Sequence, residues 1–191
     1  FRGLLLTLKG TSSEAMSVSV KWDGAPAVVC GTNPDNGRFF VGTKSVFSKT
    51  PKINYTKKDI ATNHGTDELG QKLLKCLVHL KKLNIPGVVQ GDLLYTDEGI
   101  TRKNIDGKPH LTFTPNTITY AVPEDGDLAK QIDRAKLGII FHTTYAGDSL
   151  ATMNAQGGAD VSSFAQSPDV FFDNASYKDV SGSAKFTADE S

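Results

Sequence analysis

Residues 18–27 read Val18-Ser19-Val20-Lys21-Trp22-Asp23-Gly24-Ala25-Pro26-Ala27, so a lysine, an aspartate and a glycine follow a run of alternating polar and apolar residues. The alternation over 17–22 has period two, the pattern of a half-buried strand, and an apolar run resumes over 25–30. Asp-Gly between two such runs favours a turn, because glycine tolerates backbone conformations that other residues avoid. We therefore expect Lys21 to stand where a strand ends and a turn begins.

The chain after this segment predicts mainly β-structure. The sequence Asn33-Pro34-Asp35-Asn36-Gly37 separates β-rich runs over 27–31 and 38–42, and Asn-Gly in that setting is a strong hairpin signal. Strand patterns recur over 88–95, over 111–122 with a break at Pro115-Asn116, and over 137–145. Leucines at helical spacing predict an amphipathic helix over 66–82, and a shorter helix is expected over 127–136. Strands outnumber helices and are mostly joined by turns, which favours the α+β class with antiparallel sheets.

Composition bounds the class of protein. The 191 residues are 38% hydrophobic and 22% charged, as in ordinary globular proteins, and no apolar run approaches the roughly 18 residues of a membrane span. The chain starts at Phe1 without methionine and shows no signal peptide, so we expect a cytoplasmic piece of a longer protein. Residues 1–150 are expected to form one domain, followed by a polar C-terminal segment over 151–191.

The charges balance only in total. The 21 lysines and arginines equal the 21 aspartates and glutamates, but residues 1–96 hold 13 of the former and 7 of the latter. Residues 44–58 contain Lys44, Lys49, Lys52, Lys57 and Lys58 and no acid. This segment is interpreted either as a solvated basic loop or as a surface for an anionic partner.

Cysteine and histidine spacing excludes several chemistries. Cys30 and Cys76 lie in apolar stretches without a metal-ligand spacing, so both are predicted to be reduced core residues. The four histidines are scattered, and no H-E-x-x-H pair, P-loop or Gly-x-Ser-x-Gly sequence occurs. A zinc enzyme, a P-loop nucleotidase and an α/β-hydrolase are therefore not favoured.

The K-x-D-G at Lys21-Trp22-Asp23-Gly24 resembles the nucleophile motif of the covalent nucleotidyltransferases, the superfamily of ATP-dependent DNA and RNA ligases and mRNA capping enzymes. Three later segments match the order of motifs in that superfamily. They are Val41-Gly42-Thr43-Lys44-Ser45, Val88-Val89-Gln90-Gly91-Asp92-Leu93-Leu94 and Ile118-Thr119-Tyr120-Ala121-Val122. Parts of residues 21–145 also look like uncharacterised ligase-like proteins of tailed phages.

The resemblance implies a nucleotidyltransferase domain over 1–150, with antiparallel sheets flanking a nucleotide cleft. Lys21 would be the catalytic nucleophile that forms a lysyl-AMP from ATP with Mg²⁺. Asp92 would face the ribose or the metal, and the other nucleotide-binding positions would be Asp23, Gly24, Lys44 and Tyr120. The implied partner is a nucleic-acid end, RNA or DNA, in the cytoplasm of a bacterial or phage-infected cell.

Each residue also has a structural reading. The alternative for Lys21 is an exposed lysine on a β-turn, that for Lys44 is a surface lysine, and that for Tyr120 is a core tyrosine. An acid within an apolar strand, such as Asp92, is costly unless it is paired or faces a site. Leu137 stands where the superfamily has a metal-holding glutamate, and no Lys-x-Lys pair follows. Either those motifs lie beyond Ser191 or the domain is a catalytically inactive nucleotide- or nucleic-acid-binding phage accessory protein.

Overall fold

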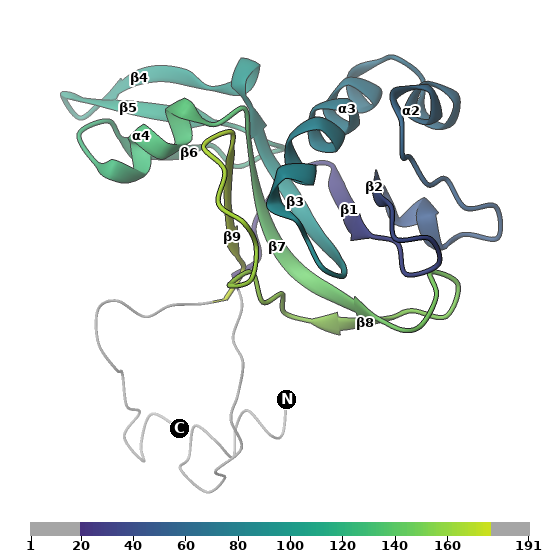
Figure 1. Ribbon diagram of the computed structural model, residues 1–191. Coiled ribbons are helices and arrows are strands. Elements are labelled where there is room, and N and C mark those ends of the chain that lie inside the picture. Colours follow the sequence, from purple (N-terminus) through teal and green to yellow (C-terminus); the bar gives the residue numbers. More distant parts are fainter. Residues whose placement is uncertain (1–19, 177–191) are drawn as a thin grey trace, which may run out of the picture. The chain divides into compact units, whose positions relative to one another are not determined.

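The computed structural model describes residues 20–176 (Figure 1). The chain divides into two units, one comprising Trp22–Ala175 and the other comprising Phe1–Lys21 with Ser176–Ser191. All the helices and strands named below belong to the Trp22–Ala175 unit. This unit continues past the boundary expected at residue 150, because its last two strands, β8 and β9, pair with the preceding sheet.

The larger sheet is built around two long central strands. Strands β3 and β7 pair antiparallel over most of their length, and β1 and β2 extend the sheet beyond β3. On the other side of β7, β8 pairs antiparallel and β9 pairs parallel. The six strands are β1 (Ala27–Thr32), β2 (Phe39–Gly42), β3 (Val88–Thr96), β7 (Leu137–Ala146), β8 (Asn154–Gly157) and β9 (Val170–Asn174).

Strands β4 (Thr101–Ile105), β5 (Lys108–Phe113) and β6 (Tyr120–Pro123) form a second, antiparallel sheet. The turn between β4 and β5 consists of Asp106 and Gly107, both at positive φ (51° and 78°), as a tight two-residue hairpin requires. Helix α4 (Asp127–Arg134) packs against this sheet through Ala129 and Ile132.

Two α-helices lie near β1 and β3 (Figure 1). They are α2 (Lys57–His64) and α3 (Glu68–Leu80), and α3 begins at the N-cap Asp67, whose side chain accepts a hydrogen bond from the Gly70 amide. Leu73, Cys76 and Leu80 of α3 are fully buried against Val28, Leu93 and Phe141 of the sheet. We call this the helix-side core. Three short 3₁₀ helices complete the elements, η1 (Lys44–Phe47), η2 (Lys81–Leu83) and η3 (Asp97–Gly99).

The other face of the larger sheet carries two separate apolar clusters. One joins Leu94 and Ile140 of the larger sheet to Phe113 of the second sheet and to α4, and we call it the β5-side cluster. The other joins Val29 and Val88 to Val46 of η1, and we call it the η1-side cluster. The stretch of sheet between these two clusters is where the candidate site lies.

The α+β class with antiparallel sheets is confirmed, and β9 is the one parallel addition among the described strands. The predicted hairpin, the helix near 66–82 and the strands near 88–95 and 137–145 are all present. Of the strand expected over 17–22, residues 17–19 lie outside the described residues, and Val20–Trp22 are not in a strand. Among residues 20–176, no helix is both long and apolar enough to span a membrane.

Candidate functional site

A polar strip interrupts the apolar side chains on one face of β3. Successive side chains of a strand point to opposite faces, and Val89 and Leu93 point into the helix-side core. Their neighbours Val88 and Leu94 belong to the two clusters on the opposite face. Gln90 and Asp92 lie between these two on that face, and Gln90 is buried. Two polar side chains in the middle of a strand cost free energy, so their placement calls for partners or a function.

A bulge in β7 supplies the partner of Asp92. Gln90 pairs with Thr143 and Gly91 pairs with Phe141, so His142 is the extra residue of the bulge. Its Nε2 lies 3.4 Å from Asp92 Oδ1, and its Nδ1 lies 2.8 Å from the Thr143 hydroxyl. The side chains of Asp92 and His142 keep 20% and 28% of their exposure, so solvent or a ligand reaches both.

Tyr145 closes the other end of the strip. Its hydroxyl donates to Gln90 Oε1 at 2.7 Å, and its ring packs on Phe47 of η1 with centroids 4.4 Å apart. We use the term polar strip for Gln90, Asp92, His142 and Tyr145. The strip holds hydrogen-bonding groups from two strands on one open face, a suitable surface for a ligand that carries several polar atoms.

The turn at Trp22–Ala25 packs directly on this strip. The Ala25 amide donates to the Leu93 carbonyl at 2.9 Å, and the Leu93 amide donates to the Pro26 carbonyl at 3.1 Å. A Cβ on Gly24 would lie 2.4 Å from Asp92 Cβ, a separation that real atoms do not tolerate. Glycine at position 24 is therefore what allows the K-x-D-G turn to approach the acid of β3.

Asp23 anchors the turn to the loop between β5 and β6. Its carboxylate accepts hydrogen bonds from the amides of Ile118 and Thr117, from the Thr117 hydroxyl and from the Asn116 side chain, all within 2.7–3.0 Å. These donors favour the charged carboxylate and hold the pKa of Asp23 well below its usual range, the Ile118 amide contributing most. Asp23 thus positions the turn against this loop, with three of the four hydrogen bonds going to Oδ2 and one to Oδ1.

Tyr120 lies beside the turn rather than free on a surface. Its hydroxyl accepts a hydrogen bond from the Asp23 amide at 2.9 Å. Its ring lies 5.2 Å from that of Trp22 and 5.5 Å from that of Phe113, measured between centroids. Within the described residues, the ring is therefore packed among aromatic neighbours, which is the core role that the sequence left open.

The two candidate lysines are both exposed. Lys44 begins η1, the helix whose Val46 and Phe47 pack in the η1-side cluster, and it makes no ion pair among the described residues. Lys21 is bonded to Trp22, the first residue of the Trp22–Ala175 unit, and belongs to the other unit. The structure therefore brings together Asp23, Gly24, Asp92 and Tyr120, while Lys44 starts a helix at the far end of the strip.

Strand β7 contributes no carboxylate to the strip, because its sequence contains no aspartate or glutamate. Leu137 is fully buried in the helix-side core, so its side chain lies on the face away from Asp92. Within residues 20–176, no group of three or more histidine, cysteine, aspartate or glutamate side chains is arranged to hold a metal ion. Asp92 is the acid that the strip itself offers to a cation.

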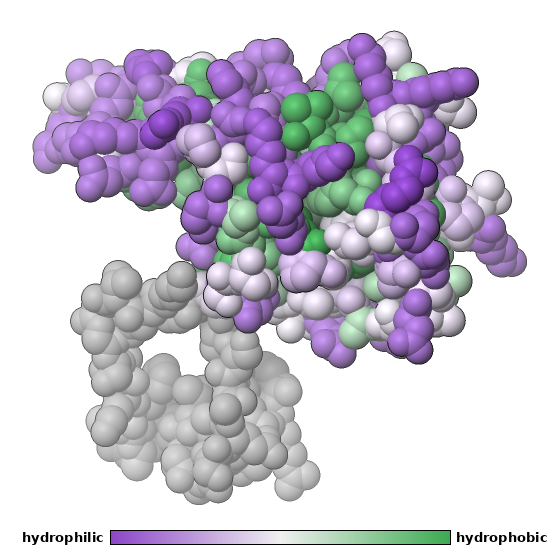
Figure 2. All heavy atoms as spheres, in the orientation of Figure 1, coloured by the Kyte–Doolittle hydropathy of each residue, from purple (hydrophilic) through white to green (hydrophobic). Residues whose placement is uncertain are grey.

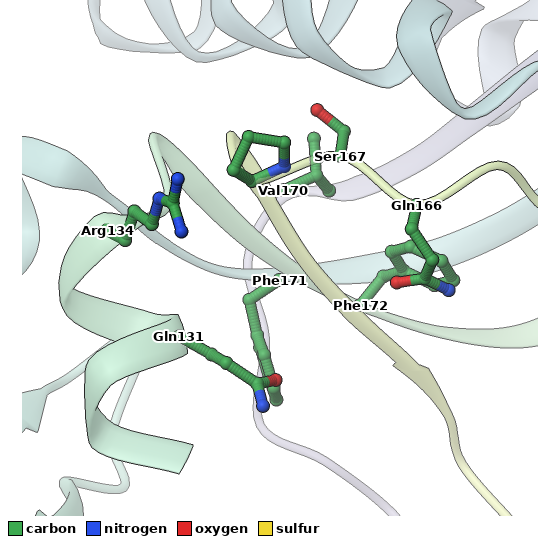
Figure 3. A pocket seen from close by; sticks show the side chains of 8 residues that line it. Gln131, Arg134, Gln166, Ser167, Val170, Phe171 and Phe172 are labelled. Atoms are coloured by element: carbon green, nitrogen blue, oxygen red, sulfur yellow. The ribbon is translucent and has the colours of Figure 1, made fainter. Parts of the chain in front are cut away.

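One pocket is lined by residues of α4, β9 and the segment before β9, and none of its lining residues belongs to the strip (Figure 3). It has a volume of about 270 Å³ and lies between α4 and β9, where the side chains of Gln131 and Phe171 lie side by side. A smaller pocket, of about 80 Å³, is lined by Ala25 of the turn and by Leu94 of β3, among other residues.

His142 is the site residue that sequence reasoning missed. Its distance of 50 positions from Asp92 and its place on a bulge have no signature in a single sequence, because pairing register depends on the partner strand. The one available signal in the sequence is that His142 directly follows the apolar run Leu137–Phe141.

Comparison with curated proteins gives no match, and comparison with solved structures gives none either. A family model described as a family of unknown function, DUF6267, matches residues 2–191. The match spans the described residues with both sheets, the K-x-D-G turn and the polar strip. The chain therefore belongs to the DUF6267 family.

Proposed function

We propose that this chain is an ATP-dependent polynucleotide ligase-like nucleotidyltransferase that acts through a covalent lysyl-AMP on Lys21. The observation that supports this most strongly is the contact between Gly24 of the K-x-D-G turn and Asp92 of β3. These two residues are 68 positions apart and come from two segments that resemble successive motifs of the superfamily. Their contact is what a nucleotide site built from those motifs requires.

In the proposed reaction, the neutral amine of Lys21 attacks the α-phosphorus of ATP. A phosphorus–nitrogen bond forms, the bond to the bridging oxygen breaks, and pyrophosphate leaves with the electron pair while the amine proton passes to solvent. An oxygen of a nucleic-acid 5′-phosphate then attacks the adenylate and displaces the lysine. Attack by a 3′-hydroxyl on the activated end finally releases AMP and seals the strand.

The residues of the strip fit a magnesium ion shared with the substrate. Mg²⁺ is commonly held by one or two carboxylates together with substrate phosphates, and Asp92 offers one partly exposed carboxylate. Bound there, the ion would neutralise the charge that develops on the phosphates. Asp23 would hold the turn through the loop at 116–118, and His142 would keep the Asp92 carboxylate in place.

The test is covalent labelling of the full-length protein. The protein is incubated with α-³²P-labelled ATP and Mg²⁺, denatured, and separated by electrophoresis. We expect acid-labile label on the wild type, none on Lys21→Ala, and strongly reduced label on Asp92→Asn. Lys136→Ala is the matched control, since this exposed lysine contacts Asp97 far from the strip and should label normally. Label that is absent from the wild type, or equal on Lys21→Ala, contradicts the proposal.

A specific observation favours a second candidate, a nucleotide- or nucleic-acid-binding protein without catalysis. Leu137 occupies the position of the superfamily's second acid and is buried in the core. The labelling experiment separates the two candidates when it is combined with equilibrium binding of ATP. Saturable ATP binding by a wild-type protein that takes up no label supports the binding protein.

A further inference from the structure

The segment from Arg38 to Lys58 carries six cations that form no ion pair among the described residues. They are Arg38, Lys44, Lys49, Lys52, Lys57 and Lys58, all exposed, and we call them the basic surface. Of the ten later lysines and arginines within residues 59–176, six form ion pairs: Lys72, Lys75, Lys82, Arg102, Lys130 and Lys136. Pairing is thus common in the rest of the described chain and absent in this segment.

Hydrogen bonds join the parts of this segment into one surface. The Val41 amide of β2 donates to the Asn54 carbonyl at 3.0 Å, and the Lys52 amide donates to the Ser45 carbonyl of η1 at 3.2 Å. The Asn63 side chain of α2 donates to Asn54 Oδ1 at 2.9 Å. The cations therefore stand on a connected framework of β2, η1, the following loop and α2. Figure 2 shows hydrophilic side chains along the side of the molecule where α2 lies.

Two of these lysines destabilise the helix in which they lie. Lys57 and Lys58 occupy the first turn of α2, where the helix dipole favours acidic side chains. The one acid of that turn, Asp59, accepts hydrogen bonds from the amides of Tyr55 and Thr56 and so completes the capping box. The first turn therefore carries two lysines against one aspartate, so the positive potential of the lysines and of the helix N-terminus is only partly compensated.

The basic surface adjoins the polar strip. Val46 and Phe47 of η1 pack in the η1-side cluster, and Phe47 contacts Tyr145, whose hydroxyl binds Gln90 of the strip. The η1 part of the basic surface, with Lys44, is therefore the part that adjoins the strip, at its Tyr145 end, whereas α2 packs through Ile60 in the helix-side core. The exposed large hydrophobic residues of the described chain are Val20, Val78, Ile118 and Leu128, and none belongs to this segment. The surface lacks the apolar side chains with which membrane-binding helices insert into a bilayer.

We infer that the basic surface binds the phosphodiester backbone of a single nucleic-acid strand, the acceptor of the proposed reaction. The identity of the strand as an acceptor rests on the proposed function, whereas the binding itself does not. Each lysine at a phosphate releases a counterion, so binding weakens as salt rises, with a slope of about −0.7 per contact on a log–log scale.

The experiment measures binding of a fluorescein-labelled 20-nucleotide poly(U) strand to the full-length protein by anisotropy over a range of salt concentrations. For Lys57→Gln/Lys58→Gln we expect weaker binding, by about tenfold at low salt, and a slope smaller in magnitude by about 1.4. The matched control is Lys103→Gln/Lys108→Gln. It removes two exposed lysines, also without ion pairs among the described residues, from the hairpin of β4 and β5.

Unfolding of α2 would also weaken binding, but it would lower the melting temperature of the variant. Removing lysines from the first turn should instead leave the melting temperature equal or higher. Equal losses of binding in the two double variants, or no loss in either, overturn the inference. Tighter binding of phosphatidylserine vesicles than of the strand also overturns it. Both variants should take up label from ATP as the wild type does, so a wild type that binds the strand but takes up no label contradicts only the proposed function.

Discussion

At the scale of single residues, Asp23 and Gly24 explain why the turn that follows Lys21 needs its sequence. Gly24 leaves room for Asp92, and the Asp23 carboxylate holds the loop between β5 and β6 through four hydrogen bonds. The structure thus gives the aspartate of the K-x-D-G sequence an anchoring role within the protein. Asp92 and His142 are the polar groups left facing outward.

We predict that Asp23→Asn lowers the melting temperature at neutral pH, because the asparagine amide cannot accept all four hydrogen bonds. The pKa of Asp23 is depressed in the folded protein, so its contribution is fully present above the unfolded pKa, about 3.9, and is lost as the pH falls below it. The difference in melting temperature between wild type and variant should therefore shrink below about pH 4. Thermal scans from pH 7 to pH 2.5 measure it.

Asp125→Asn is the matched control for this prediction, because Asp125 is exposed and makes no side-chain hydrogen bond among the described residues. Its melting temperature should follow that of the wild type at every pH. A difference for Asp23→Asn that stays constant down to pH 2.5 would show that the carboxylate charge is not what the loop amides recognise.

At the scale of elements, α3 is the helix that holds one face of the larger sheet. Leu73, Cys76 and Leu80 are fully buried, while Val78 on the same helix keeps 52% of its exposure. Burial raises the pKa of the Cys76 thiol to about 12 and that of Cys30 well above its usual range, so both thiols stay neutral in the folded protein. The helix therefore contributes packing to the helix-side core.

We predict that Leu73→Ala lowers the free energy of unfolding by about 3 kcal/mol, because a buried leucine leaves a cavity between α3 and the sheet. Val78→Ala, on the exposed side of the same helix, should change it by less than about 0.5 kcal/mol. Urea denaturation followed by circular dichroism measures both. Similar small changes in the two variants would mean that α3 does not pack on the sheet as described.

The sequence predicts those elements whose apolar pattern is strong. The leucines of α3 and the apolar runs of β3 and β7 are enough to predict these elements, and Asn36-Gly37 predicts the hairpin of β1 and β2. Strand β4 has mostly exposed residues and β8 only exposed ones, so neither shows the alternation on which strand prediction depends. In the sequence, β9 is visible only as an apolar cluster at 170–172.

The same physics limits prediction of the site. Asp92 is recognisable because an acid stands out in an apolar strand. His142 reaches it only through the bulge between two strands 50 positions apart, and the anchoring of Asp23 by residues 116–118 likewise depends on tertiary folding. For Tyr120 the sequence allows both a stacking role and a core role, and its contacts with the rings of Trp22 and Phe113 depend on tertiary folding.

At the scale of the whole molecule, the neutral net charge conceals an uneven distribution. The basic excess of residues 1–96 is concentrated in six cations between residues 38 and 58, which form no ion pair among the described residues. Six of the ten lysines and arginines within residues 59–176 do form ion pairs. Helix η1, which begins at Lys44, packs on the face of the larger sheet that α3 does not cover. Helix α2, which begins at Lys57, contributes Ile60 to the helix-side core.

The most direct test of the account is to locate the adenylate on the chain. The full-length protein is incubated with ATP and Mg²⁺, digested under conditions that preserve phosphoramidates, and its peptides are sequenced by mass spectrometry. We predict AMP on Lys21 alone, and its loss when pyrophosphate is added back. AMP on any other residue, or an unmodified Lys21 in a protein that binds ATP, would contradict the central claim.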